Sequence, residues 1–275
     1  MTVKASTQSG ARNSEIVNYT INESAQWVST WRSLSLDTRY YWGFGGAVDQ
    51  ESFHRAGVGT LFSHEERVLA LVAGVDTRRR QWLSEGPSQG QQLRLFAETS
   101  NGLHGAYSGN VYRADWRGHF AFGKTVVSLR WNEVHAQPDA EALQLGGIAS
   151  EETYALPVLN QREFPLRGYS SGESVLIGHR ARLGTIEWRI PLADIDRHLM
   201  VPPAGVNRIS TNVFVDSGSA WESGAPQHYY RGVGLELLSE IRLGYQFELQ
   251  LRAGVAKGLD APGITMGYLR IGRSF

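Results

Sequence analysis

The sequence predicts an all-β fold: a closed antiparallel β-barrel of about twelve strands, with 14 or 16 strands as alternatives. Glycine at 31 of 275 residues, together with 8 Trp, 11 Tyr and 10 Phe, favours strands and tight turns. Apolar and polar residues alternate in most segments, and apolar residues seldom recur at the spacing of a helix. Breaks that contain Gly or Pro recur roughly every 15 to 25 residues, which favours one continuous meander over two domains.

The segment 243–258 shows the alternation most clearly. Its apolar positions are Tyr245, Phe247, Leu249, Leu251, Ala253 and Val255, and its polar positions are Gln246, Glu248, Gln250 and Arg252. In a water-soluble sheet, the apolar side of such a strand packs against a second layer. The segment therefore raises the question of what covers that side.

The same pattern recurs along the chain and defines the expected elements in order. We expect strands at Trp27–Trp31, Tyr40–Val48, Ala56–Phe62, Leu69–Val75, Leu93–Ala97, Tyr112–Phe120, Val127–Trp131, 178–191, 207–218, 229–240, 243–256 and 263–275. Residues 1–22 are expected to form a polar amino-terminal segment or a partial strand, and 23–275 the barrel. If Ile16–Ile21 is a strand with a partner, the count rises to fourteen.

Amphipathic strands of about ten residues with aromatic residues at their ends are typical of a transmembrane β-barrel. Hydrocarbon offers no hydrogen-bond partner to the backbone, so only helices and closed barrels cross a bilayer. The sequence has no apolar run of the roughly 20 residues that a spanning helix needs. The alternative is a soluble β-sandwich or a lipocalin-like barrel. It is disfavoured because aromatic residues line one side of many strands while Arg, Glu and Asp line the other.

Charge and cysteine content exclude several classes of function. The net charge is zero and the pI is near 7.1, which gives no electrostatic reason to expect a nucleic-acid partner. The absence of cysteine excludes disulfides, thiolate metal ligands and a thiol nucleophile. The first fifteen residues are polar and unlike a signal peptide. For an exported barrel, we therefore expect that a signal peptide was removed.

Few residues suggest a metal, a cofactor or covalent chemistry. The eight histidines never fall in a His-x-His or His-x-x-x-His spacing, so no metal site is expected. The glycine clusters lack the helix that a phosphate-binding loop needs, and no cofactor is expected. A membrane-embedded hydrolase would need a Ser/His pair, but His179, His228 and the nearby serines form no acyl-transfer motif. The arginine run in 76–82 fits a contact with lipid headgroups or lipopolysaccharide, or a solvated strand end.

The carboxyl terminus, GYLRIGRSF, carries a possible assembly signal. Leu269, Ile271, Arg273 and the terminal Phe275 fall on one side of the last expected strand. This arrangement resembles the β-signal by which bacterial outer-membrane barrels are recognised for assembly.

A longer resemblance begins at REFPLRGY. Leu166, Arg167, Gly168 and Tyr169 resemble the [V/L]-R-G-[F/Y] motif in the sixth loop of the bacterial surface-antigen barrel family. This family includes the BAM-complex insertase, the TAM-complex barrel and the two-partner secretion transporters. Three further blocks follow in the family's order: GTIEWRIPL from Gly184, VFVDSGSAW from Val213 and RGVGLEL from Arg231. The resemblance covers about residues 145–275.

The resemblance implies a site inside the barrel. The loop at 157–177 would fold into the lumen, where Arg167 would meet Asp216 and Glu187. A guanidinium binds carboxylates through two parallel bonds, and a partly dehydrated lumen would strengthen them. Gly168 would allow the backbone to turn tightly. The alternative is that Arg167 is a solvated loop charge, and that the two carboxylates pair with lumen arginines such as Arg189 or Arg182.

The resemblance also implies a function in the bacterial outer membrane. The chain would assist insertion or translocation of protein, or of lipid, without covalent chemistry. Its partners would be outer-membrane lipids and lipopolysaccharide, unfolded client polypeptide and the machinery that recognises the terminal strand. Two departures from the family are visible: the chain has no room for a POTRA module before its first strand, and about twelve strands replace the usual sixteen. A passive or gated pore is the second hypothesis and a lipid hydrolase the third.

Overall fold

The computed structural model describes residues 2–4, 18–34, 37–55, 59–79, 86–148, 158–200, 203–243 and 247–273. Nearly all of the regular structure in these ranges is β-strand. The strands are β1 (Thr2–Lys4), β2 (Asn18–Leu34), β3 (Arg39–Arg55), β4 (Gly59–Asp76), β5 (Gly90–Thr99), β6 (Asn110–Phe122), β7 (Thr125–Ala136), β8 (Leu143–Leu145), β9 (Glu163–Phe164), β10 (Ile177–Gly178), β11 (Arg180–Met200), β12 (Pro203–Trp221), β13 (Tyr230–Leu243), β14 (Phe247–Gly258) and β15 (Thr265–Arg273). One 3₁₀ turn, η1, covers Ser174–Leu176.

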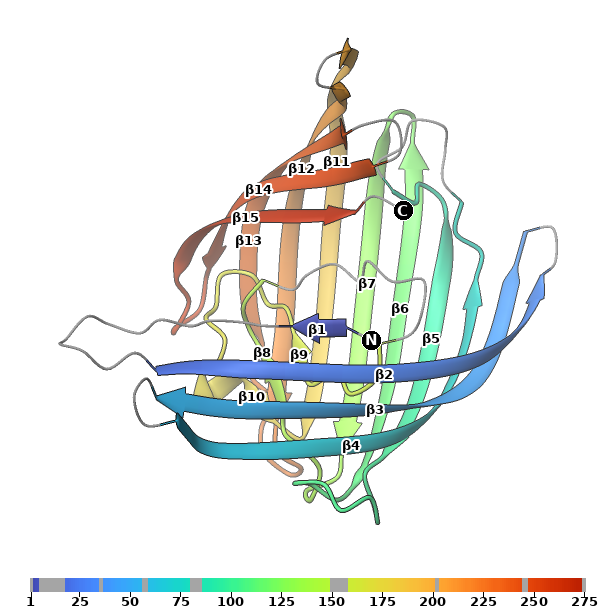
Figure 1. The fold of residues 1–275 in the computed structure, drawn as a ribbon. Coiled ribbons are helices and arrows are strands. Elements are labelled where there is room, and N and C mark those ends of the chain that lie inside the picture. Colours follow the sequence, from blue (N-terminus) through green and yellow to red (C-terminus); the bar gives the residue numbers. More distant parts are fainter. Residues whose placement is uncertain are drawn as a thin grey trace.

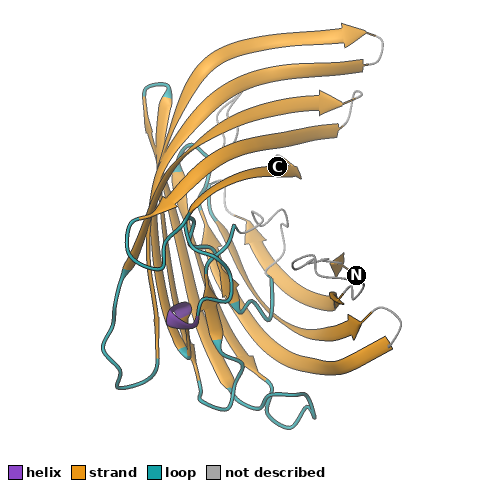
Figure 2. Cartoon of the chain, turned by 90° about the vertical axis from the view of Figure 1, so that its left-hand side faces the viewer, coloured by secondary structure: helices purple, strands orange, loops and turns teal. Residues whose placement is uncertain are grey.

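The main sheet is antiparallel and has twelve strands, so the predicted all-β class is confirmed. The strands follow in chain order from β1 to β7 and then from β11 to β15 (Figure 1). The second small sheet has the order β10-β8-β9 and lies in the connection between β7 and β11. Within the described residues, no pairing joins β15 to β1 or β2, and Figure 2 shows the sheet as an open arc. The expected closure is therefore not observed, and an edge strand remains on each side of the opening.

One expected division of strands is wrong. The segments Ala56–Phe62 and Leu69–Val75 were expected to be separate strands, whereas β4 runs unbroken from Gly59 to Asp76. The charged residues between them do not break the strand because each charge has a partner. Arg67 binds Glu65 on the same side of the strand, and Glu66 on the other side accepts a bond from a residue of the β7–β11 connection. The strand count of twelve is reached instead by β1, which falls within residues 1–22, where a polar segment or a partial strand was expected.

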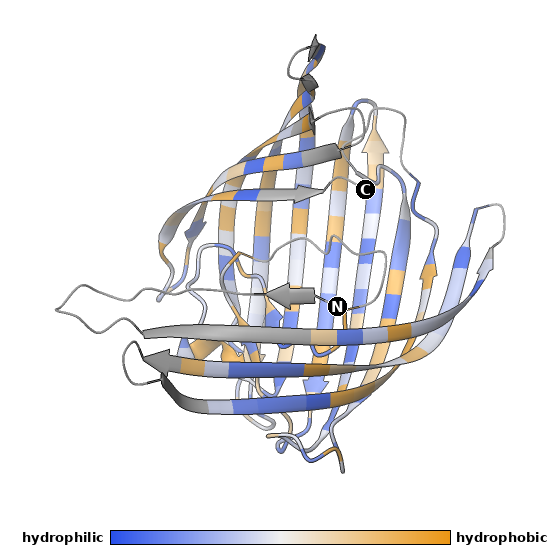
Figure 3. Ribbon diagram, in the orientation of Figure 1, coloured by the Kyte–Doolittle hydropathy of each residue, from blue (hydrophilic) through white to orange (hydrophobic). Residues whose placement is uncertain are grey.

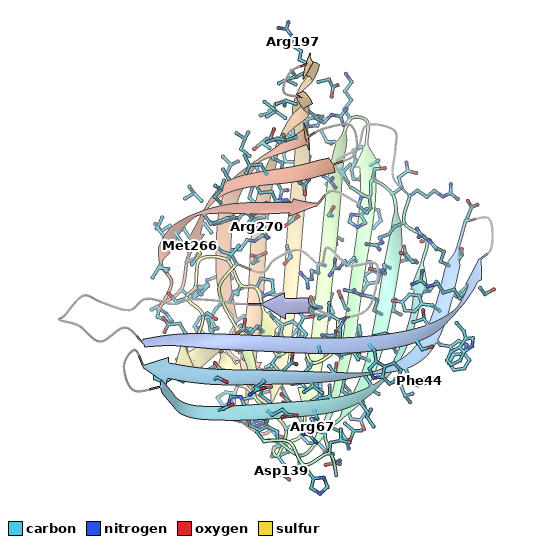
Figure 4. All side chains as sticks on the ribbon, in the orientation of Figure 1. Phe44, Arg67, Asp139, Arg197, Met266 and Arg270 are labelled. Atoms are coloured by element: carbon cyan, nitrogen blue, oxygen red, sulfur yellow. The ribbon has the colours of Figure 1, made fainter. Side chains whose placement is uncertain are left out.

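The outer face of the sheet is apolar and exposed. Figure 3 shows apolar and polar residues alternating along many strands, as the period of two requires. Leu71 on β4, Val215 on β12 and Leu235 on β13 all lie exposed on the same outer face. Near one end of β2 and β3, the rings of Trp31 and Trp42 stack with their centroids 4.5 Å apart. Phe44 lies beside Trp31, and Figure 4 shows it projecting outward from the sheet.

The inner face is charged and partly covered by the described residues of the connection between β7 and β11, which are 137–148 and 158–179. We call these residues the inner loop. It packs on two apolar clusters, one centred on Leu183 of β11 and one on Val72 of β4. Around these clusters lie buried carboxylates and arginines of the sheet.

The two ends of the sheet differ in their connections. The inner loop and the β12–β13 and β14–β15 connections lie at one end, and the tight β6–β7 turn at the other. Figure 4 places Asp139 of the inner loop and Arg197 of β11 at these opposite ends. Within the described ranges, no helix has the length and apolar character needed to cross a bilayer.

Candidate functional site

The inner loop has its own small core, which fixes its position on the sheet. Apolar residues of the loop are almost fully buried against β11 and neighbouring strands; they are Leu143, Leu145, Phe164, Leu166, Tyr169 and Leu176. The parallel pairing of β8 with β9 holds Leu145 beside Phe164. Leu166, a predicted site residue, is therefore an apolar contact that places the next residue, Arg167, over the charged face.

Arg167 binds Asp216 of β12 through two parallel hydrogen bonds. Its Nε donates to Oδ2 at 2.7 Å and its Nη2 to Oδ1 at 2.8 Å, and its backbone N–H donates to Oδ2 at 3.3 Å. Both residues are buried. Paired donors on a planar guanidinium match a carboxylate in length and direction, so this arrangement fixes orientation as well as charge.

Two further carboxylates complete the surroundings of Arg167. Its Nη1 lies 2.8 Å from Oε1 of Glu187 on β11 and 3.3 Å from Oε1 of Glu236 on β13. The guanidinium carbon lies 3.4 Å from the ring centroid of Phe214, which adds a cation–π contact. Of the predicted residues, the structure thus brings Arg167, Asp216 and Glu187 together.

Glu236 has a central role that the sequence did not reveal. It is fully buried and accepts bonds from Tyr268 Oη at 2.6 Å and Arg270 Nη2 at 2.8 Å, both on β15. Asn212 on β12 donates to its other oxygen at 3.0 Å. Glu236 therefore links the inner loop to the carboxy-terminal edge strand. In the sequence it is one of many alternating polar residues, and nothing in RGVGLEL distinguishes it.

Gly168 and Tyr169 secure the loop after the arginine. Gly168 has a φ of 95°, and a Cβ there would lie 2.4 Å from the backbone nitrogen of Gly258. Tyr169 donates its hydroxyl to the carbonyl of Arg231 at 2.9 Å and accepts the N–H of Asp260 at 3.1 Å. Both contacts fix the loop to β13 and to the β14–β15 connection.

The arginines that were the alternative partners of the two predicted carboxylates also bind other groups. Arg182 donates two hydrogen bonds to Glu133 of β7. Arg189 donates to the carbonyl of Pro87 at 3.1 Å. Arg167 is therefore the loop cation at Asp216 and Glu187, and it is not a solvated charge.

Three of the four residues of the expected assembly signal lie in β15. Leu269 is exposed on the outer face. Ile271 and Arg273 pair in register with Leu251 and Leu249 of β14. Phe275 lies outside the described residues.

A second polar cluster lies where the inner loop meets the amino-terminal strands. Arg162 donates to Oε2 of Glu98 on β5 at 2.7 Å, and it lies 3.5 Å from Glu66 on β4 and 3.7 Å from Glu141 in the loop. Asn160 donates to Asp49 and Glu66. Burial, and then the neighbouring Glu66 carboxyl, raise the pKa of Glu141 to about 9. No motif surrounds Arg162 in the sequence, and this cluster was not predicted.

The histidines form no metal centre in the described part of the chain. His179 bonds to Glu222 at 2.9 Å, and His228 packs edge-on against Tyr230. A Ser/His contact does occur, between His119 and Ser128, whose Nδ1 and Oγ lie 2.9 Å apart on the inner face. Nε2 of His119 has no hydrogen-bond partner within the described residues, so no carboxylate orients the ring as in a Ser/His/Asp site.

The comparisons with known proteins show a shared fold. No protein-family model matches the sequence, and no curated protein matches it. Among solved structures, the chain is similar to BamA from Haemophilus ducreyi lacking POTRA domains 1-3, with a TM-score of 0.54 and 13% identity. The match covers 94% of this chain and 54% of that chain, so this chain spans about half the length of its structural neighbour. The chain therefore has a BamA-like antiparallel β fold.

Proposed function

We propose that the chain resides in a bacterial outer membrane and assists insertion or translocation of polypeptide. The observation that carries this proposal is the buried Arg167–Asp216 pair on the inner face of a sheet that is not closed. An unpaired edge strand can template another strand through backbone hydrogen bonds. The inner loop reaches that edge, because Arg167 and Arg270 of β15 share Glu236.

The outer face supports the membrane location. Exposed Leu, Val, Phe and Trp side chains line it on many strands, whereas a monomer in water rarely exposes such a continuous apolar face. Outer-membrane barrels carry short turns on the periplasmic side and longer loops outside. We therefore place the inner-loop end toward the cell exterior and the β6–β7 turn toward the periplasm.

A reconstitution experiment tests the insertion proposal. Proteoliposomes that contain the chain should fold an unfolded β-barrel client faster than empty liposomes do. A photo-crosslinking residue at Leu269 on the edge strand β15 should capture the client, whereas the same residue at Leu235 on β13, two strands in from that edge, should not. Both positions are exposed on the outer face, so they differ mainly in distance from the edge. Equal folding rates, or equal capture at both positions, would contradict the proposal.

The second candidate function is a gated pore, and the charged inner face favours it. Arg94, Arg117 and Arg130 all lie within 4.0 Å of Asp115 on the inner face, as in a polar channel lining. Heat-modifiable migration on a gel first shows that the parent and Arg167→Ala are folded. The single-channel conductances of the two refolded proteins are then compared. A parent that is nearly closed and a variant that opens or flickers would support a loop-gated lumen. Equal, wide and stable conductance would favour the passive pore.

The remaining proposals concern partners and chemistry. Outer-membrane lipid, lipopolysaccharide and unfolded polypeptide are the proposed partners, together with the assembly machinery that reads the terminal strand. We propose no covalent chemistry. Release of fatty acid from phospholipid vesicles by the protein, abolished by Ser128→Ala, would overturn this and favour the hydrolase.

A further inference from the structure

The inner loop contacts the amino-terminal strands as well as the carboxy-terminal ones. Its residues 158–162 lie against strands β2 to β6. The Leu159 N–H donates to Gln26 Oε1 of β2 at 3.0 Å, and the Asn160 N–H donates to Glu98 of β5 at 3.2 Å. Arg113 of β6 donates to Gln161 Oε1 at 2.8 Å and also to the Val158 carbonyl.

Arg162 is the charged centre of this contact. Its side chain is 7% exposed, as is that of Arg167. Its hydrogen bond to Glu98 and its proximity to Glu66 reproduce, on β4 and β5, the chemistry of Arg167 on β11 and β12. If a buried guanidinium loses its carboxylates, or buried carboxylates lose their guanidinium, an unpaired charge remains in the interior. Separating the loop from the strands at such a contact therefore costs free energy.

An apolar contact supports the same attachment. Leu159 is buried in a cluster with Ala47 of β3, Val72 of β4 and Phe96 of β5. The inner loop thus has an apolar residue beside its first arginine, as Leu166 lies beside the second. No strand of the sheet supplies a carboxylate to both arginines: Glu66 and Glu98 come from β4 and β5, and Glu187, Asp216 and Glu236 from β11 to β13.

We propose that Arg162 is a second anchor, and that residues 158–169 tie the two walls of the open sheet together. In the described sheet, no backbone pairing joins the amino-terminal edge to the carboxy-terminal edge. The separation of these walls is therefore set by the curvature of the sheet and by this tie. Arg162 acts here as a positioning residue. The proposal concerns the shape of the molecule and stands whether or not the protein handles clients.

Distance measurements between the walls test the tie. The chain has no cysteine, so one molecule can carry two spin labels, one at Val48→Cys on β3 and one at Val215→Cys on β12. Both positions are exposed on the outer face. The parent should give one narrow distance distribution. Arg162→Gln should broaden it, Arg167→Gln should broaden it too, and Arg79→Gln, which breaks an exposed pair with Asp37, should leave it unchanged. A narrow distribution in Arg162→Gln would overturn the proposal.

Hydrogen exchange then separates the two anchors. Arg162→Gln should speed exchange in β3 to β5 by at least about tenfold and leave β12 and β13 unchanged, and Arg167→Gln should give the reverse. If Arg162→Gln does not fold, Arg162→Gln combined with Glu98→Gln removes both charges of the closest pair. In that variant the same regional pattern is expected. If exchange becomes faster evenly along the sheet, or if Arg162→Gln and Arg167→Gln speed exchange in the same strands, Arg162 has no separate role.

Discussion

Arg167 and Asp216 are 49 positions apart in the sequence, and the guanidinium of one holds both carboxylate oxygens of the other. The pair joins the inner loop to the second half of β12. Because Glu187 and Glu236 flank it on β11 and β13, the loop cation touches three consecutive strands. One loop residue thereby fixes the loop to the carboxy-terminal wall of the sheet.

Arg167→Gln should lower the free energy of unfolding by about 3 to 5 kcal/mol, because it leaves buried carboxylates without their cation. Urea unfolding in detergent, followed by tryptophan fluorescence, measures this. Arg79→Gln is the control, since the Arg79–Asp37 pair is exposed and should contribute less than about 1 kcal/mol. Equal and small effects of both changes would show that the buried pair is not a tether.

Gly168→Ala should destabilise the protein by at least about 2 kcal/mol more than Gly172→Ala does. Both glycines have left-handed φ angles, 95° and 87°. A Cβ at Gly168 would meet the backbone of Gly258, whereas at Gly172 nothing lies within 4 Å. Gly172→Ala therefore measures backbone strain alone, and the difference measures the close approach. The same urea unfolding assay applies, and two equal losses would contradict the packing argument.

The alternation of residues was sufficient to predict the sheet and its outer face. Period-2 patterns depend only on neighbours in the sequence, so Leu235, Val255 and Leu269 could be assigned to one face without tertiary information. Strand ends were less predictable. Glu65 and Arg67 look like a break in the pattern, but their pairing allows β4 to continue through them.

The candidate site also contains both residues that were predicted from the sequence and residues that were not. Arg167, Asp216 and Glu187 were predicted because motifs in the carboxy-terminal half resemble a known family. Arg162 and Glu236 carry no motif, and their roles depend on which strands the loop reaches. Closure of the sheet was expected from chemistry, since edges in hydrocarbon are unfavourable, but the observed pairings leave both edges open.

Glu236→Gln should loosen β15 more than Glu187→Gln does. Glu236 accepts bonds from Tyr268 and Arg270 of β15, and a neutral amide cannot satisfy two donors and two further arginines as a carboxylate does. Amide exchange in β15 should become at least about tenfold faster in Glu236→Gln. Glu187 binds Arg167 from β11, which is separated from β15 by β12, β13 and β14, so β15 should stay protected in Glu187→Gln. Equal protection of β15 in both variants would contradict this role.

The second anchor should weaken in alkaline solution. Burial and the neighbouring Glu66 raise the pKa of Glu141 to about 9, so the folded state favours its protonated form. Stability from a raised carboxyl pKa is complete below the ordinary value and is lost as the pH rises through the folded value. Between pH 7 and pH 10, the distance distribution between labelled Val48→Cys and Val215→Cys should therefore broaden. Glu141→Gln, which cannot ionise, should remove the pH dependence, and an unchanged dependence would exclude Glu141 as its source.

The outer face gives the sharpest test of the membrane proposal. Leu71 lies on β4 with 66% of its surface exposed, and in a water-soluble protein an exposed Leu→Arg change there would be nearly neutral. In a bilayer, an arginine on the lipid face costs about 2 to 4 kcal/mol near the midplane and about 0 to 1 near the interfaces. Leu71→Arg should therefore lower the folded fraction and the unfolding free energy in liposomes.

Leu259→Arg is the matched control for this change. Leu259 is also exposed, at 52%, but it lies in the β14–β15 connection outside the strands, so the same substitution should have little effect. A ratio of folded to unfolded protein that falls for Leu71→Arg and not for Leu259→Arg would place β4 against hydrocarbon. If both variants fold like the parent, in liposomes and in buffer, the apolar face of the sheet does not meet lipid. The outer-membrane proposal would then have to be abandoned, although the ties formed by Arg162 and Arg167 would remain.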